Sequence, residues 1–255
     1  MTVLEATNIK KVYGDRGNLH TALKDIDLQV SKGEFVGIMG PSGSGKSTLL
    51  NVLSTIDAPT SGSIKINEKN MMNLYEDELA HFRREQLGFI FQDFNLLDTL
   101  TAKENIALPL ALANVSNKEI DKRIKSVSEI FGIEKILDQY PFELSGGQQQ
   151  RTAAARAIIT KPSLIFADEP TGALDSKSAH NLLQTLATLN SQEKATILMV
   201  THDAFAASFC QRVLVINDGM IFTEIYKGEQ TRKQFFQQII NILATLGGGG
   251  HHDIV

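Results

Sequence analysis

The sequence predicts an α/β protein with a mainly parallel sheet flanked by helices, an N-terminal antiparallel β element and an inserted helical lobe. One observation is a set of short apolar runs without polar alternation, typical of strands that are covered on both faces. These runs are Phe35–Met39, Leu164–Ala167, Thr196–Val200 and Val213–Ile216. The other is a helical pattern between two of the runs, where leucines recur at helical spacing. Its members are Ala179, Leu183, Leu186 and Leu189. This alternation favours helices on both faces of one sheet.

Two regions depart from this alternation. Leu4–Lys10 and Ile26–Val30 are predicted strands with no long helix between them, which indicates the antiparallel element. The region Thr101–Tyr140 is helical throughout, punctuated by Pro109 and Pro141. One of its helices carries an apolar stripe made of Ile120, Ile124, Val127 and Phe131. We therefore expect a helical lobe inserted into the α/β core.

Composition limits the classes of function. The chain has 255 residues and a formal net charge of −4, so we expect no basic face for nucleic acid. The single cysteine, Cys210, excludes an internal disulfide framework and fits a reducing cytosol. No apolar run approaches the roughly 20 residues of a membrane-spanning helix, and the N-terminus lacks the pattern of a signal peptide. Any work at a membrane is expected to go through another chain.

A glycine-rich segment follows the predicted strand Phe35–Met39 and opens a helix at about Gly45. The segment reads Gly40-Pro41-Ser42-Gly43-Ser44-Gly45-Lys46-Ser47, with Thr48 next. Strand, glycines, lysine and hydroxyl in this order predict a phosphate-binding loop for ATP, since backbone N–H groups and the helix start face the phosphates. We expect Lys46 to reach the β- and γ-phosphates and Ser47 to bind Mg²⁺. The alternative is a glycine-rich turn with a chance lysine.

A second buried strand ends in two acids, Asp168 and Glu169. Asp168 stands at the carboxyl end of the strand, where ligands bind in open α/β sheets, and is expected to hold Mg²⁺ through water. Neighbours in a strand face opposite ways, so Glu169 is expected to polarise the attacking water as general base. Taken alone, the two acids could simply be solvated at a strand end.

A second glycine-rich loop lies about a hundred residues after the first. It reads Leu144-Ser145-Gly146-Gly147-Gln148 and opens a helix that runs through Gln148–Ile159. Free N–H groups at that helix start make an anion site far from the chain's own phosphate loop. Two copies facing head to tail would place each loop on the other's γ-phosphate. The simpler interpretation, a helix cap that contains glycine, does not account for Gln148 or the order of motifs.

Together these motifs resemble those of the nucleotide-binding subunit of ABC transporters, which have a P-loop ATPase fold. The resemblance extends from about Leu4 to Lys227. It implies that Tyr13 stacks on adenine and that Gln92 binds Mg²⁺ and senses a membrane partner. It also implies that His202 contacts the γ-phosphate. Asp175, in Ala173-Leu174-Asp175, would lie in a loop that crosses a dimer interface.

The resemblance also implies an organisation. Residues 1–228 would form one ATP-binding domain, with a core at 1–95 and 160–228 and a helical subdomain at about 100–158. Beyond the resemblance, an amphipathic pattern predicts a C-terminal helix at 229–246, and a run of glycines predicts a flexible tail at 247–255. The implied partners are a second copy of the chain and a transmembrane permease, which would hold the chain at the cytoplasmic side of the membrane. The implied ligands are ATP and Mg²⁺.

Two stretches indicate a branch of the family. The run Glu169–Asp175 looks like the branch of macrolide exporters, lipoprotein-releasing ATPases and the cell-division ATPase. Within it, Gly88–Thr101 and Ala173–Ala179 are most similar to Bce/Vra-type ATPases of Gram-positive bacteria. Those ATPases serve resistance to bacitracin and related peptides, with a large permease that is often coupled to a sensor histidine kinase. The resemblance therefore implies a role in antimicrobial-peptide resistance.

Other functions stay open at this point. A DNA-repair or chromosome-organising ATPase needs a long coiled coil between the two glycine loops, and a translation factor needs two such domains; the sequence has neither. A regulator that gates a partner with ATP is harder to separate from a transporter. The C-terminal helix is amphipathic, and packing onto its own domain is favoured over a membrane or partner surface. Its apolar residues are Phe235, Phe236, Ile239, Ile240 and Leu243, and a His251-His252 pair follows in the tail.

Overall fold

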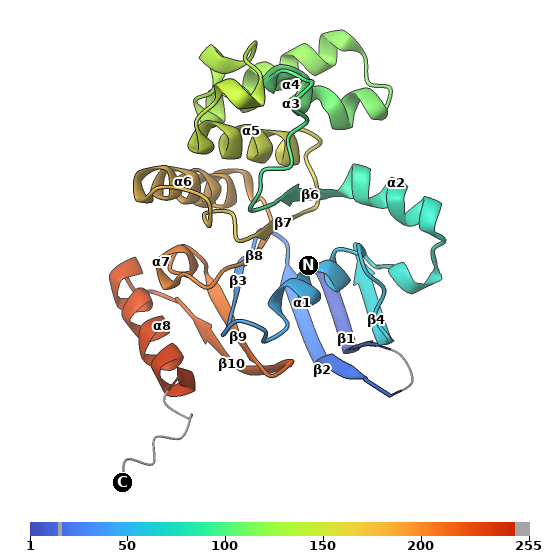
Figure 1. Cartoon of the computed structure of the whole chain (residues 1–255), viewed down its shortest axis with the longest axis vertical. Helices are drawn as coiled ribbons and strands as arrows, with labels where there is room; N and C mark the ends of the chain where they lie inside the picture. The colour runs from blue at the N-terminus through green and yellow to red at the C-terminus, as the bar shows by residue number, and fades with distance from the viewer. Residues whose placement is uncertain (15–16, 248–255) are drawn as a thin grey trace.

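The computed structural model describes residues 1–14 and 17–247 and arranges them around a central six-stranded sheet (Figure 1). The strand order is β10-β9-β3-β8-β7-β6, and only β10 runs antiparallel to its neighbour. The strands are β3 (Phe35–Met39), β6 (Leu87–Ile90), β7 (Leu164–Asp168), β8 (Ile197–Val200), β9 (Arg212–Asn217) and β10 (Met220–Tyr226). The predicted parallel sheet is confirmed, and the four apolar runs predicted from the sequence are β3, β7, β8 and β9.

The central strands are apolar throughout because both of their faces are covered. Along β7, Leu164 and Phe166 belong to one buried cluster, and Ile165 and Ala167 belong to the other. Successive side chains of a strand point to opposite faces, so a strand buried on both sides has no position for a polar residue. Only the end of β7, at Asp168, becomes partly exposed.

A second sheet covers one of these faces. Its order is β2-β1-β4-β5, all antiparallel, and its strands are β1 (Thr2–Tyr13), β2 (His20–Ser31), β4 (Ser61–Ile66) and β5 (Lys69–Asn70). The helix α1 (Lys46–Leu53) shares one apolar cluster with both sheets through Leu49, Leu50, Val52 and Leu53. The predicted N-terminal antiparallel element is confirmed, with longer strands than the sequence indicated.

Helices cover the other face and form the lobe at the top of Figure 1. The lobe consists of α3 (Ala102–Leu112), α4 (Asn117–Phe131) and α5 (Gly146–Ile158), with short turns η2 (Glu134–Ile136) and η3 (Pro141–Glu143). The predicted stripe of α4 is buried as expected. Pro109, predicted to punctuate the region, lies inside α3 instead. It stands in the last turn and has no N–H to donate to the carbonyl of Asn105, four residues earlier.

The remaining helices complete the layers. They are η1 (Met71–Asn73), α2 (Glu76–Gln86), α6 (Ser176–Glu193), α7 (Ala204–Ala207) and α8 (Arg232–Gly247). No helix among the described residues is long and apolar enough to cross a membrane. The tail predicted from residue 247 onwards, with His251-His252, falls on residues 248–255 and so outside the described residues.

The C-terminal helix α8 packs on the chain's own domain beside α7 (Figure 1). Phe235 and Ile239 are fully buried in the helix-side cluster, and Leu243 and Leu246 lie partly buried against it. The guanidinium of Arg232 lies 4.3 Å from the ring centroid of Phe209 on the segment after α7, a cation–π contact. The apolar stripe of α8 is thus used within the domain.

Two adjacent isoleucines on α8 provide a matched test of this packing. Ile239 is 0% exposed and Ile240 is 38% exposed. We expect Ile239→Ala to lower the free energy of unfolding by about 2–4 kcal/mol, because it leaves a cavity, and Ile240→Ala by less than about 1 kcal/mol. Urea denaturation of both variants measures the difference. Equal effects would show that α8 is not packed on the domain in this register.

Candidate active site

The phosphate-binding loop runs from the carboxyl end of β3 to the start of α1, and two of its glycines touch backbone from other strands. A Cβ on Gly40 would lie 2.1 Å from the carbonyl oxygen of Ile216, and one on Gly45 would lie 2.6 Å from that of Ala22. Their φ angles are 153° and 100°, which side chains also disfavour. Any other residue at these positions would push the loop away from β9 and β2.

Lys46 begins α1 with its side chain folded over the loop. Its Nζ donates to the carbonyl oxygens of Gly40 at 3.0 Å and Pro41 at 2.9 Å. Burial lowers the pKa of the Lys46 ammonium, while Glu169 and Asp168 nearby act to raise it. The Lys46 ammonium therefore donates to two carbonyl oxygens of the loop, and the oxygens of a bound phosphate could accept these hydrogen bonds instead.

Asp168 ends β7 close to Ser47. Burial raises the pKa of Asp168, as does the nearby Glu169, whereas a hydrogen bond with Ser47 and the charge of Lys46 lower it. Its buried Oδ1 has no hydrogen-bond partner among the described residues. A carboxylate and a hydroxyl suit a hard cation that prefers oxygen ligands, and the unpaired Oδ1 leaves a position for one. The described residues contain no cluster of three His, Cys, Asp or Glu side chains that could hold a metal by themselves.

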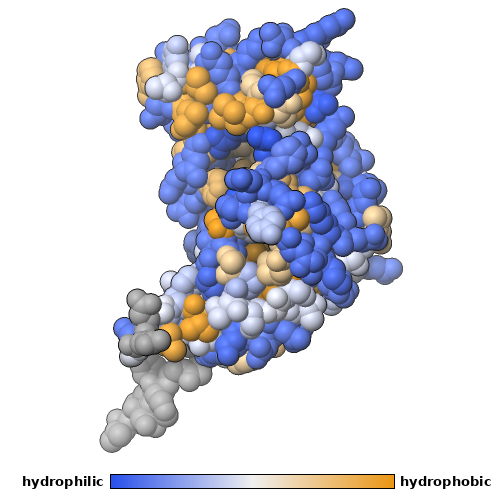
Figure 2. All heavy atoms as spheres, turned by 90° about the vertical axis from the view of Figure 1, so that its right-hand side faces the viewer, coloured by the Kyte–Doolittle hydropathy of each residue, from blue (hydrophilic) through white to orange (hydrophobic). Residues whose placement is uncertain are grey.

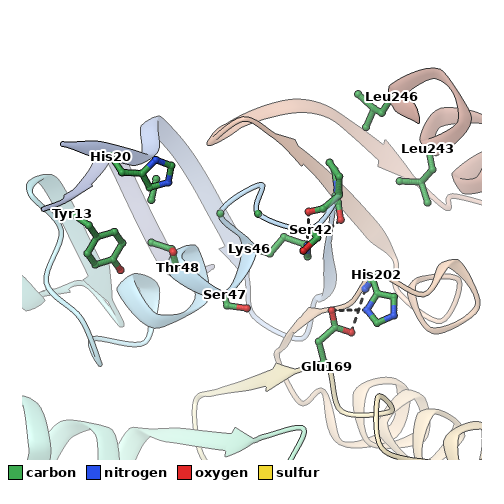
Figure 3. A pocket seen from close by; sticks show the side chains of 15 residues that line it. Tyr13, His20, Ser42, Lys46, Ser47, Thr48, Glu169, His202, Leu243 and Leu246 are labelled. Carbon is green, nitrogen blue, oxygen red and sulfur yellow. Dashed lines mark hydrogen bonds and ion pairs between the residues drawn. The ribbon is translucent and has the colours of Figure 1, made fainter. Parts of the chain in front are cut away.

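Glu169 and His202 form a pair at the same edge of the sheet (Figure 3). The Oε1 of Glu169 lies 2.9 Å from Nδ1 of His202, and its Oε2 accepts a hydrogen bond from the His202 backbone N–H at 3.3 Å. Glu169 has a φ of 45°, in the left-handed region, while its N–H still donates to Val200 at 2.9 Å. This turn of the backbone directs the Glu169 carboxylate into the cavity rather than along the sheet.

These groups line one cavity of about 770 Å³, large enough for a nucleotide (Figure 3). The predicted residues that line it are Tyr13, Gly40, Pro41, Ser42, Gly43, Gly45, Lys46, Ser47, Thr48, Glu169 and His202. Ser44, also predicted, is buried behind the loop with an unpaired hydroxyl. Asp168 lies beside Ser47 without being part of the lining.

Four lining residues were not predicted: His20 and Ala22 from β2, and Leu243 and Leu246 from α8. A lone histidine and alanine in a strand carry no signal of a site. The two leucines belong to an apolar stripe whose packing partner only the fold reveals. No feature of the sequence would have placed them beside the phosphate loop.

Gln92 is not among the residues that line this cavity. It follows β6, which pairs with β7, the strand that ends at Asp168. Its side chain packs against Gly172, in the turn after Glu169, where an added Cβ would lie 3.0 Å from the Gln92 Cδ. The structure therefore places Gln92 beside the segment that carries Glu169.

The second glycine-rich loop also lies apart, at the start of α5. Ser145 caps the helix, since its Oγ accepts from the Gln148 N–H at 3.3 Å and the Gln148 Oε1 accepts from the Ser145 N–H at 2.8 Å. The first turn contains no acidic residue, so the positive end of the helix is uncompensated there. None of the four residues Ser145, Gly146, Gly147 and Gln148 lines the cavity.

Asp175 is engaged as the cap of the neighbouring helix α6. Its Oδ1 accepts from the N–H groups of Lys177 and Ser178, both at 3.0 Å, and its Oδ2 accepts from the Ser178 hydroxyl at 2.6 Å. The Ser178 side chain in turn lies against Gly147. The predicted site residues therefore fall into two groups on one chain, one around the phosphate loop and one where α5 and α6 begin.

Two polar side chains of α5, missed in the sequence, connect these groups. Gln150 is fully buried, and its Nε2 donates to the carbonyl oxygens of Phe91 at 3.0 Å and Pro170 at 2.6 Å. Arg156 donates to those of Phe94 at 2.9 Å and Asn95 at 2.5 Å. The helix that begins at Ser145 is thus bonded to the segments that carry Gln92 and Glu169.

Comparisons with known proteins agree with this geometry. Residues 23–172 match the model of the ABC transporter family. The chain is 58% identical to the bacitracin export ATP-binding protein BceA of Halalkalibacterium halodurans, over 97% of this chain and 98% of the relative. It is 52% identical to the ABC transporter ATP-binding protein YxdL of Bacillus subtilis, over 98% and 96%.

Solved structures give the same result for the fold. The ATP-binding cassette MJ0796 of Methanocaldococcus jannaschii, solved as a dimer in a post-hydrolysis state with ADP and Pi, superposes with a TM-score of 0.81. It is 41% identical and covers 88% of this chain and 98% of its own. The chain therefore belongs to the ABC transporter family, of which it is an ATP-binding and ATP-hydrolysing member.

Proposed function

We propose that this chain is the ATPase that drives a separate membrane permease in resistance to bacitracin-like peptide antibiotics. The observation that carries the ATPase part is the single cavity in which a phosphate loop, a buried lysine and the Glu169–His202 pair meet. The peptide-resistance part is supported by the 58% identity, over nearly the whole chain, to a protein named for bacitracin export.

Within the cavity each residue has a role that its position supports. The N–H groups from Gly43 to Thr48 hold the phosphates at the start of α1, and Lys46 exchanges its carbonyl partners for β- and γ-phosphate oxygens. Tyr13, at the opposite end of the cavity from Glu169, stacks on the adenine (Figure 3). Ser47 and Asp168 hold Mg²⁺, which when bound screens the charge of the triphosphate. Gln92, whose side chain lies beside Gly172 in the turn after Glu169, is the further ligand of that ion in this proposal.

Glu169 acts as general base on the attacking water. Its carboxylate faces the cavity and is oriented by two contacts from His202, one from the ring and one from the backbone. The His202 ring is then placed to contact the γ-phosphate while it holds Glu169. Neither residue needs another element to reach its position, because the ends of β7 and β8 are neighbours in the sheet.

The separation of the two groups of residues supports a head-to-tail dimer. The start of α5 has no acidic residue in its first turn, and its residues do not line the chain's own cavity. A second copy in opposite orientation would bring Ser145, Gly146, Gly147 and Gln148 to the γ-phosphate, with the loop of Asp175 at the interface. MJ0796, solved as a dimer with ADP and Pi, is the solved relative in keeping with this proposal.

A groove between the helical lobe and the core is the proposed docking site of the permease. It encloses about 460 Å³ and is lined by Ile56, Arg83, Arg84, Leu87, Gly88, Phe89, Phe91, Asn95, Leu108, Pro109, Leu112, Arg156, Ala157 and Thr160. In Figure 2, apolar side chains gather on the lobe above a hollow in this face of the molecule. The apolar lining and the arginines at its rim fit a permease segment that carries apolar and acidic side chains.

This groove also lies next to the segment that carries Gln92, since Phe91 lines it. A permease bound there holds the chain at the cytoplasmic side of the membrane and can move Gln92 with it. Contact with a sensor histidine kinase would be indirect, through that permease.

Other members of the family fit less well. The macrolide export ATP-binding/permease protein MacB of Neisseria gonorrhoeae is 43% identical to this chain. This chain spans only 36% of the length of MacB, whose name combines an ATP-binding protein with a permease. The bacitracin export ATP-binding protein BceA, by contrast, matches this chain over 98% of its own length. A lipoprotein-releasing, cell-division-type or purely regulatory complex remains the second candidate, and the partner captured from membranes decides between them.

Lys46→Ala tests the phosphate site. We expect ATP affinity to fall roughly tenfold or more, since about 1.5–3 kcal/mol of charged hydrogen bonding is lost. Equilibrium titration with a fluorescent ATP analogue measures it, and Lys10→Ala, at an exposed position outside the cavity, is the control. Unchanged affinity in Lys46→Ala would contradict the role assigned to this residue.

Glu169→Gln tests the general base and the dimer together. We expect ATP binding to persist, hydrolysis to fall by roughly 10²–10⁴-fold, and an ATP-bound dimer to accumulate because its bound nucleotide is not consumed. Phosphate release and light scattering at saturating ATP measure the two effects. Ser145→Asp keeps a helix cap but adds a negative charge where a phosphate should bind, so it should abolish both the dimer and hydrolysis. Full hydrolysis by a Ser145→Asp monomer would refute the two-copy site.

Membrane capture tests the permease. The wild-type chain should retain a permease from native membranes and should restore bacitracin resistance to cells that lack it, whereas Leu112→Arg should do neither. Leu112 lines the groove and is 57% exposed, so its replacement leaves the core intact. Phe222→Arg, at a 55% exposed position on β10, is the matched control and should behave as wild type. Capture of a lipoprotein-releasing or cell-division complex would favour the second candidate.

A further inference from the structure

The Tyr13 side chain, at the end of β1, is held by contacts with other side chains. It is 40% exposed and lines the cavity beside Thr48 (Figure 3). Its hydroxyl donates a 2.8 Å hydrogen bond to Oδ2 of Asp57, which lies outside the cavity. Burial and this hydrogen bond raise the pKa of the Tyr13 hydroxyl, so it stays a donor. The ring is therefore fixed in orientation before any nucleotide arrives.

Lys11 covers one face of the same ring. Its Nζ lies 4.8 Å from the ring centroid, 2.6 Å from Oδ1 of Asp57 and 2.7 Å from the carbonyl oxygen of Ala58. Residues two apart in a strand share a face, which brings Lys11 and Tyr13 together. Tyr13 lines the cavity and Lys11 does not. The face of the ring that the cation leaves free is thus the one available to a base.

Asp57 stays ionised between these two donors. Burial raises the pKa of its carboxyl group, but the hydrogen bonds from Lys11 and Tyr13 outweigh burial and leave the pKa below its ordinary value. Its Oδ1 accepts a hydrogen bond from Lys11, and its Oδ2 accepts one from Tyr13. A single carboxylate therefore sets both the tilt of the ring and the position of the cation over it.

The backbone around Asp57 is hydrogen-bonded to α1, the helix that follows the phosphate loop. The N–H groups of Ile56 and Asp57 both donate to the carbonyl oxygen of Asn51 in α1, at 2.9 and 3.1 Å. The Thr60 hydroxyl, three residues on, accepts from the Val12 N–H at 2.9 Å. The helix α1 has 8 residues, a span of about 12 Å. It therefore links the group that holds the phosphates to the group that holds Tyr13.

We propose that Asp57 and Lys11 are positioning residues for the nucleotide base. They hold the Tyr13 ring so that one of its faces stays open to the base. The helix α1 sets the distance between this ring and Lys46. This inference rests on the proposed function, in which Tyr13 stacks on adenine. The ligand class is a planar base joined to a triphosphate. Asp57 and Lys11 contact the Tyr13 ring and do not line the cavity, so they affect the binding of the base and not that of the phosphates.

A double-mutant cycle tests the network. Tyr13→Phe removes only the hydroxyl, and Asp57→Ala removes its acceptor together with the partner of Lys11. Each should weaken ATP binding by about three- to tenfold, and the double variant should be no weaker than the weaker single one, because both remove one interaction. Affinity for inorganic tripolyphosphate, which has no base, should stay within about twofold in all three. Displacement of a fluorescent ATP analogue measures both ligands.

Further variants make the outcome decisive. Lys11→Met should weaken ATP binding without changing tripolyphosphate binding, while its exposed neighbour Lys10→Ala should change neither. Equal losses of ATP and tripolyphosphate affinity would mean that the network supports the loop rather than the base, and additive losses would mean that Asp57 and Tyr13 act separately; either result overturns the proposal. If Tyr13→Ala weakens ATP binding while Tyr13→Phe and Asp57→Ala do not, base stacking stands and the network fails. If Tyr13→Ala has no effect, base stacking itself fails, and Lys46→Ala still tests the phosphate site independently.

Discussion

The nucleotide site depends on close backbone contact between the phosphate loop and two strands it does not belong to. Gly40 lies against the carbonyl of Ile216 in β9, and Gly45 lies against that of Ala22 in β2. The loop is thereby fixed to both sheets at once. The turn after β9 adds hydrogen bonds, since Gly219 donates to Ser44 at 3.1 Å and accepts from Lys24 at 2.8 Å. Because these contacts are between backbone atoms, they do not depend on a side-chain rotamer.

Much of this was predictable, and the reason is physical. The strand Phe35–Met39 and the loop after it were recognised because a strand buried on both faces and a glycine-rich turn each leave a local pattern. The helix α2 left none: of its 11 residues only Phe82 is buried, so it has no apolar stripe to detect. The strand β4 (Ser61–Ile66) was also missed, because it opens with the polar residues and glycine of Ser61-Gly62-Ser63 and so has no apolar pattern over its first half.

Most members of the site were predictable from the sequence, but their arrangement was not. Tyr13, Lys46, Glu169 and His202 share one cavity, which the sequence could suggest only through their order. The position of Gln92 beside Gly172 follows from the pairing of β6 with β7, and strand pairing is not encoded in any local pattern. The same limit explains why Gln150 and Arg156 passed unnoticed: polar residues within a helix become informative only when the carbonyls they meet are known.

The C-terminal helix α8 serves two parts of the molecule at once. Its first turns are anchored by Phe235 and Ile239, while Leu243 and Leu246 form part of the cavity wall beside the phosphate loop. Substitutions of Leu243 or Leu246 would change the wall of the cavity, although both residues belong to the last helix of the described chain.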